Sequence, residues 1–177
     1  MSLDPGNERG NQPGEAGDNA NNGQTPTNAW KDLSQLSSVA NYSVLANLLA
    51  STAALPALDY SGKSLTINAA AGSATMVRLS PNNADLILTG TPTLQQVVSA
   101  GSCNITFTTA TTVAGTGIRN YYDGLRFSSS TNFTADAVVT YTGGHRYALH
   151  QLGGGTAVFN AGVVGTGYSC SRIVNSS

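Results

Sequence analysis

Charged residues are scarce in this chain of 177 residues, which has a formal net charge of −1. Only 10% of the residues are Asp, Glu, Lys or Arg, and no glutamate follows Glu15. Proteins that bind nucleic acid or anionic lipid use clustered Lys and Arg, and no such cluster is present. We therefore expect neither a nucleic-acid partner nor a membrane partner.

Long apolar runs are also lacking. The longest candidate, "VLANLLASTAALPAL" at 44–58, is interrupted by polar residues and by Pro56. It falls short of the roughly 18 consecutive apolar residues that a membrane-spanning helix needs. The N-terminus is acidic and polar, unlike a secretory signal. The sequence therefore predicts a soluble chain without a targeting segment.

Groups for acid and base catalysis are few. The only histidines, His145 and His150, lie close together in the sequence. Asp123 lies in "YYDGL", a context in which aspartate commonly supports a turn. No G-x-S-x-G nucleophile motif is present. From residue 56 onward the carboxylates are Asp59, Asp85, Asp123 and Asp136. We therefore expect no catalytic residue, no metal site and no cofactor.

Cysteine is limited to Cys103 and Cys170, which belong to no C-x-x-C motif. The two residues can form one disulfide in an oxidising environment, or they can be two buried free thiols that pack as small apolar side chains. Zinc is excluded because two isolated cysteines do not supply a ligand set. The sequence leaves the disulfide and the free thiols as open alternatives.

The N-terminal segment, residues 1–27, is rich in Gly, Asn and Pro and has few apolar side chains. Alone it cannot bury enough apolar surface to offset its conformational entropy. It is either a floppy tail or an extended arm that becomes ordered along a partner, and we favour the arm. The residues that we expect to contact the partner are Leu3, Pro5, Arg9, Pro13, Pro26 and Trp30.

The rest of the chain divides into two regions. Residues 28–55 have apolar residues at helical spacing, which predicts one or two short helices that anchor the arm. Residues 56–177 contain about ten short alternating runs bounded by Gly, Pro, Asn or Ser, which is typical of a β-sandwich or jelly roll. No repeat of fixed period is found, so we expect no solenoid. The predicted fold class is all-β.

The most distinctive run is "DAVVTYTGGHRYALHQL" at 136–152. A Gly-Gly pair between two alternating runs predicts a two-residue β-hairpin, in which Tyr141 and Arg146 are direct cross-strand neighbours. His145 and His150 then point to opposite faces and cannot share a ligand. The residues that define this hairpin are Tyr141, Gly143, Gly144, Arg146 and Tyr147.

This run, with "ADLILTGTPTL" and "CNITFTTATTV" before it, resembles β-rich modules of tailed-bacteriophage virion proteins, including tail fibres and head decoration proteins. Those modules often have Asp-Gly at the turn and Trp in the next strand, where this chain has Gly143-Gly144 and Tyr147. The resemblance covers about residues 60–155. It implies a virion component that is commonly trimeric and has no enzymatic activity.

The leading hypothesis is a capsid decoration, or cement, protein that binds the major capsid protein as a homotrimer. Its arm would clamp neighbouring subunits, and it would be located in the virion after assembly in the host cytoplasm. One alternative is a tail or head fibre or spike module that binds a receptor or host glycan through Tyr121, Tyr122, Tyr141 and Tyr147. A second alternative is a small β-fold hydrolase.

Overall fold

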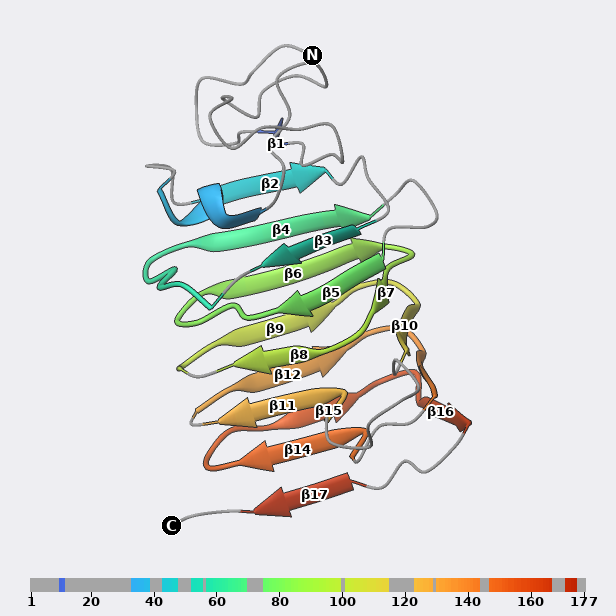
Figure 1. The fold of residues 1–177 in the computed structure, drawn as a ribbon. Helices are drawn as coiled ribbons and strands as arrows, with labels where there is room; N and C mark the ends of the chain where they lie inside the picture. The colour runs from blue at the N-terminus through green and yellow to red at the C-terminus, as the bar shows by residue number, and fades with distance from the viewer. Residues whose placement is uncertain are drawn as a thin grey trace.

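The structure is a computed structural model that describes residues 10–11, 33–38, 43–47, 52–55, 57–69, 75–99, 101–114, 123–128, 130–143, 147–166 and 171–174. Every described strand pair is parallel. The strands stack into a parallel β-solenoid of about four turns (Figure 1). The all-β prediction is confirmed, but the predicted β-sandwich or jelly roll is wrong, because those folds are built mainly from antiparallel strands.

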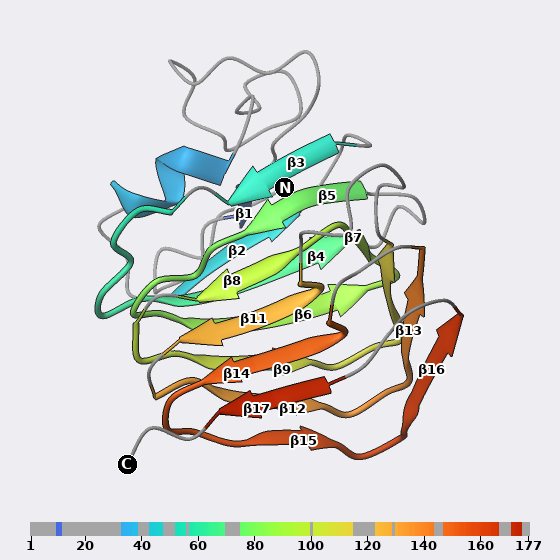
Figure 2. The same cartoon turned by 60° about the horizontal axis from the view of Figure 1, so that its bottom comes forward.

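The solenoid has three faces, which Figure 2 shows obliquely, and faces 2 and 3 belong to one ten-stranded sheet. Face 1 contains β1 (Gly10–Asn11), β2 (Ser43–Asn47), β4 (Ser64–Ala69), β6 (Asp85–Gly90), β9 (Asn104–Phe107), β12 (Asn132–Ala135) and β15 (Ala157–Phe159). Face 2 contains β7 (Thr93–Leu94), β10 (Thr111–Ala114), β13 (Val139–Thr142) and β16 (Val163–Thr166). Face 3 contains β3 (Thr52–Leu55), β5 (Thr75–Leu79), β8 (Val97–Ser99), β11 (Leu125–Ser128), β14 (Leu149–Leu152) and β17 (Ser171–Val174).

The core is formed by rows of inward side chains that repeat from turn to turn. Along β4, every second residue is buried, as the alternation of "SLTINA" predicts. Phe133 is fully buried, and its ring lies 5.0 Å from Phe107, 5.4 Å from Phe127 and 5.2 Å from Phe159, measured between centroids. Burying one such ring contributes about 1.5–3 kcal/mol, so this aromatic cluster is a major stabilising element of the last turns.

Residues 28–55 differ from the helical prediction. One short 3₁₀ helix, η2, spans Leu33–Ser37, and Leu33 and Leu36 are buried. Where a second helix was expected, Ser43–Asn47 forms β2, in which Val44 and Ala46 point inward. Its pattern fits both periodicities over so few residues, and pairing with β4 selects the strand.

The predicted hairpin at Gly143-Gly144 is wrong. β13 pairs with β10 and β16, and β14 pairs with β11 and β17, so the two strands belong to different faces. Gly143 has a φ of 85°, as a tight turn requires, but this glycine lies at a corner of the solenoid instead of reversing the chain. Tyr141 is almost fully buried, so it packs in the core instead of lying at the exposed surface on which the glycan alternative depends.

The turns differ in length, which explains why no fixed repeat is visible. Hydrogen-bonded side chains on consecutive turns are separated by 21 residues for Asn47 and Asn68, but by 19 for Asp85 and Asn104. The separation increases to 28 residues between Asn104 and Asn132. Corner loops absorb these insertions while the strands stay in register, so the expectation that there is no solenoid is wrong.

Candidate functional site

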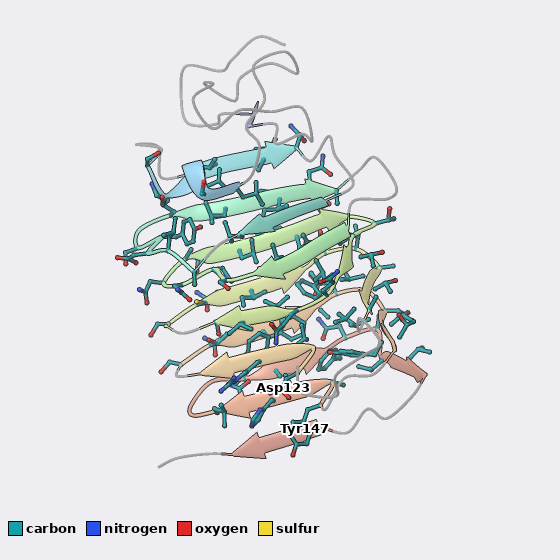
Figure 3. The ribbon with its side chains drawn as sticks, in the orientation of Figure 1. Asp123 and Tyr147 are labelled. Carbon is teal, nitrogen blue, oxygen red and sulfur yellow. The ribbon has the colours of Figure 1, made fainter. Side chains whose placement is uncertain are left out.

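The most concentrated polar chemistry of the described residues is a buried pair, Asp123 and His150. The Nδ1 atom of His150 lies 2.6 Å from the Oδ2 atom of Asp123. His150 is 5% exposed and Asp123 is 2% exposed, so their hydrogen bond is shielded from water. The ring of Tyr147 packs against the imidazole, with 5.1 Å between the ring centroids. Asp123 lies between the levels of β11 and β14, and Tyr147 lies on the side of β14 that faces β17 (Figure 3).

The solenoid register brings these residues together although they are 27 positions apart. Gly124 N–H donates to the carbonyl of Tyr147, and Leu125 N–H donates to the carbonyl of Ala148. These bonds extend the β11–β14 ladder towards Asp123. Within that ladder, Arg126 is the register partner of His150. Gln96 fixes the other side, because its Nε2 donates to the carbonyl of Asp123 at 3.0 Å.

The position of His150 is unusual for a buried side chain. Its neighbours Leu149 and Gln151 point into the solenoid, so His150 lies on the outer side of face 3. The carboxylate of Asp123 fixes the orientation of the ring and favours a proton on Nδ1. The Nε2 atom is buried and has no hydrogen-bond partner among the described residues. The pair is therefore built to hold an imidazole in one orientation.

A second candidate is the outer surface of face 1, where polar side chains form rows across the turns. In the row that we call the polar ladder, Asn104 Nδ2 donates to Asp85 Oδ1 at 2.7 Å, and Asn132 Nδ2 donates to Asn104 Oδ1 at 3.1 Å. Thr156 Oγ1 then donates to Asn132 Oδ1 at 3.2 Å. The polar ladder thus links the side chains of Asp85, Asn104, Asn132 and Thr156.

Two further rows flank the polar ladder. The middle row contains Thr66, Ile87, Thr106, Thr134 and Val158, which are register neighbours on consecutive strands. On the other side of the middle row, Asn68 Nδ2 donates to Asn47 Oδ1 at 2.9 Å. Asp85 is the one charged residue within the strands of face 1. The surface is therefore flat, nearly uncharged and rich in hydroxyl and amide groups.

The predicted contact residues of the arm, namely Leu3, Pro5, Arg9, Pro13, Pro26 and Trp30, lie outside the described residues. From the predicted arm, the structure describes Gly10–Asn11, which pairs in parallel with Leu45–Ala46 of β2. Tyr121, Tyr122, Gly144, His145 and Arg146 also lie outside the described part. The structure therefore leaves the predicted contacts of these residues as predictions.

The structure describes one of the two cysteines, Cys103. Cys103 is a buried free thiol, and its Sγ donates to the carbonyl of Pro81 at 2.7 Å. Burial raises the pKa of this thiol above its ordinary value. Cys170 lies outside the described residues. Of the two alternatives for Cys103, the structure has the free thiol.

Asp123 was predicted only to support a turn and His150 only to belong to a hairpin, so sequence reasoning missed their pairing. The one signal in the sequence was that Asp123 and His150 each lie in or beside a strand-like run. That signal predicts their contact only when the number of residues in one solenoid turn is known. Within the described residues, no three His, Cys, Asp or Glu side chains are grouped so that they could hold a metal ion.

Comparison with known proteins gave no relative. No protein-family model, curated protein or solved structure matches the chain. In the part of the chain that the structure describes, no helix has the length and apolar character needed to cross a membrane. The chemistry of the described surfaces is therefore the basis for a functional proposal.

Proposed function

We propose that this chain is a non-catalytic structural protein of a virus particle, a capsid decoration protein that binds the outer surface of a phage head. The observation that carries the proposal is the parallel pairing of Gly10–Asn11 with β2. A segment of the arm thus adds a strand to a sheet edge, which is a general way of attaching an extended peptide. Exchanged between neighbours, the same strand addition would tie one subunit to the next.

The body suits such a role because it is a rigid spacer. Each described strand is held by ladders to its neighbours, and the inner rows of apolar side chains run through consecutive turns. The polar ladder adds side-chain hydrogen bonds between turns on the outside. Binding of such a body to the shell would stabilise the shell by mass action.

The test compares the full chain with a variant that lacks residues 1–27 for binding to purified heads from which the protein has been stripped. We expect the full chain to bind at high copy number and the shortened chain to lose most of its binding. Thr106→Val/Thr134→Val is the matched control, because it alters face 1 and leaves the arm intact. Equal binding by the full and shortened chains would refute the role of the arm, and no binding by the full chain would refute the decoration role.

A second candidate function, a fibre or spike module that binds a glycan, is favoured by the outer surface of face 1. Each amide nitrogen has two protons, and one of them serves the polar ladder in Asn104 and in Asn132. The other proton and the threonine hydroxyls of the middle row are available to a polymer rich in hydroxyl groups. The rows repeat at the spacing of parallel strands, about 4.8 Å, which suits a chain-like ligand with its own repeat.

Binding to arrayed polysaccharides separates the two candidates. The glycan hypothesis predicts binding by the full chain that survives deletion of residues 1–27 and is lost in Thr106→Val/Thr134→Val, which removes two hydroxyls at nearly constant volume. Sugar released from a bound polysaccharide would instead support a hydrolase. In that case Asp123→Asn tests whether the Asp123–His150 pair takes part.

A further inference from the structure

Charge is divided unequally between the arm, residues 1–27, and the rest of the chain. The arm has four carboxylates and one arginine, which give it a net charge of −3, and the carboxylates are Asp4, Glu8, Glu15 and Asp18. Residues 28–177 contain seven basic and five acidic residues, a net charge of +2. The arm and the solenoid therefore attract each other electrostatically.

The basic residues of the described strands all lie on one face. β5, β11 and β17 each contain one arginine, namely Arg78, Arg126 and Arg172, and all three strands belong to face 3. Arg126 is exposed, and Arg172 occupies the same column, because both are register partners of His150. Arg78 precedes the buried Leu79, so its position is also an outer one. We call the outer side of face 3 at these three positions the arginine face.

The carboxylates of the solenoid do not pair with this face. Asp59, Asp85 and Asp136 each accept a hydrogen bond from an asparagine amide. Between described residues, the one ion pair is that of Asp123 with His150, and it is buried. Arg126 thus has no carboxylate partner within the described part, whereas the arm has carboxylates in excess.

The arm of the same copy is too short to reach the whole arginine face. β1 anchors the arm at one end of the solenoid, and β17 lies at the other end (Figure 1). The order β1-β2-β4-β6-β9-β12-β15 contains six strand spacings of about 4.8 Å, so the last turn is about 29 Å from β1. The arm carboxylate farthest from β1 in sequence is Asp18, seven residues after Asn11, and seven extended residues span at most about 25 Å. A neighbouring copy has no such limit.

We propose that the arginine face is the docking surface for the acidic arm of a neighbouring copy of this chain. A guanidinium can bind a carboxylate through two parallel N–H···O bonds. Arg126 and Arg172 are two strand spacings apart, about 10 Å, because β14 lies between their strands. Glu15 and Asp18 are three residues apart, which is also about 10 Å in an extended segment. The proposal rests on the proposed function, in which the arm ties neighbouring subunits, and adds the surface that the arm binds.

The test uses a fluorescein-labelled peptide of residues 1–27 and the full chain, with binding measured by fluorescence anisotropy at low ionic strength. We expect saturable binding that weakens as salt is added, because the contacts are exposed ion pairs. Arg126→Gln and Arg172→Gln should each raise Kd about two- to fivefold, and the double variant should raise it further. Lys63→Gln is the matched control, because it removes one positive charge that is not on a strand of face 3, and it should leave Kd nearly unchanged. Urea unfolding verifies that the variants fold.

A second peptide, in which Asp4 and Asp18 are replaced by Asn and Glu8 and Glu15 by Gln, should not bind. Equal binding by this neutral peptide, equal Kd values for the native chain and the double variant, or no binding by the native peptide would each overturn the proposal. The proposed function is measured separately on virus heads. A full chain that binds heads through its arm but does not bind the peptide refutes the arginine face alone, and a full chain that binds the peptide but not heads refutes the decoration role alone.

Discussion

Breaking the Asp123–His150 pair from the two sides should give unequal losses of stability. His150→Phe keeps a ring of similar shape but takes the imidazole away from a carboxylate that is only 2% exposed. Removing one partner of a buried hydrogen bond leaves the other group desolvated, which costs about 1–3 kcal/mol, and more when that group is charged. We therefore expect a decrease of that size in the free energy of unfolding.

Asp123→Asn should be milder. The amide oxygen can still accept a hydrogen bond from Nδ1 of His150, which lies 2.6 Å from the carboxylate in the native chain. What is lost is the charge assistance, and the difference between a charged and a neutral hydrogen bond is about 1 kcal/mol. The double variant leaves no buried charge, so it should lose less than the sum of the single losses, with a coupling energy of about 1–3 kcal/mol.

Urea unfolding at fixed pH measures all four proteins of this cycle, with the slope of the transition as a check on two-state behaviour. Because the pair is shielded from solvent, added salt should leave the coupling energy almost unchanged. Additive losses, or a loss for His150→Phe no larger than that for Asp123→Asn, would show that the carboxylate does not depend on the imidazole. A coupling energy that vanishes in salt would show that the pair is exposed to solvent.

Three further predictions address the turns, the free thiol and a buried phenol. Gly155→Ala should lower the free energy of unfolding by more than about 2 kcal/mol, because φ at Gly155 is +116° and the added Cβ meets the backbone of Thr131. Gly154→Ala, next to it, should be nearly neutral in urea unfolding, because its added Cβ meets only the Ser130 hydroxyl, at 4.0 Å. Cys103 should resist a thiol reagent until the chain unfolds, because the thiol is buried and its pKa is raised. The rate of labelling is measured in a Cys170→Ser background, and equal rates for the native chain and the chain in urea would contradict this prediction. Burial raises the pKa of Tyr141 above its ordinary value of 10.0, so the neutral phenol stabilises the fold fully below that pH and this stability is lost as the pH rises above it. Tyr141→Phe should therefore flatten the decrease in the free energy of unfolding at alkaline pH. An unchanged decrease would contradict the raised pKa.

The sequence predicted the inner face of individual strands but not their arrangement. Alternation in "SLTINA" and "CNITFTT" puts Leu65 and Ile67 on one face of their strand and Phe107 on one face of its own, and all three side chains are buried. Alternation, however, is a property of one strand, and it does not say whether the next strand along the chain is its neighbour. In a solenoid the neighbour lies a full turn away, and from β2 onward that distance varies from 18 residues, between Leu79 and Val97, to 28 residues, between Asn104 and Asn132. Because the turn length varies, no fixed repeat is visible in the sequence, and the short alternating runs were interpreted as a β-sandwich or jelly roll.

The same property hid the Asp123–His150 pair. A hairpin at Gly143-Gly144 would have paired His150 with the strand just before it, whereas the solenoid pairs His150 with Arg126 and brings in Asp123 from the previous turn. A glycine pair signals a change of direction but not the angle of the change. The angle is set by the corner geometry of stacked turns, which depends on residues far away in the sequence.

The scarcity of charge follows from this architecture. In a parallel solenoid with aligned registers, the same position on consecutive turns is only about 4.8 Å apart, so like charges in one row would repel through the whole stack. Neutral amides and hydroxyls avoid that repulsion and gain hydrogen bonds along the row. Two carboxylates on face 1 and its corner accept hydrogen bonds from amides of the next turn, since Asn104 donates to Asp85 and Asn160 donates to Asp136. The low content of charged residues is therefore consistent with the fold, because charged side chains at one position of consecutive stacked strands would repel each other.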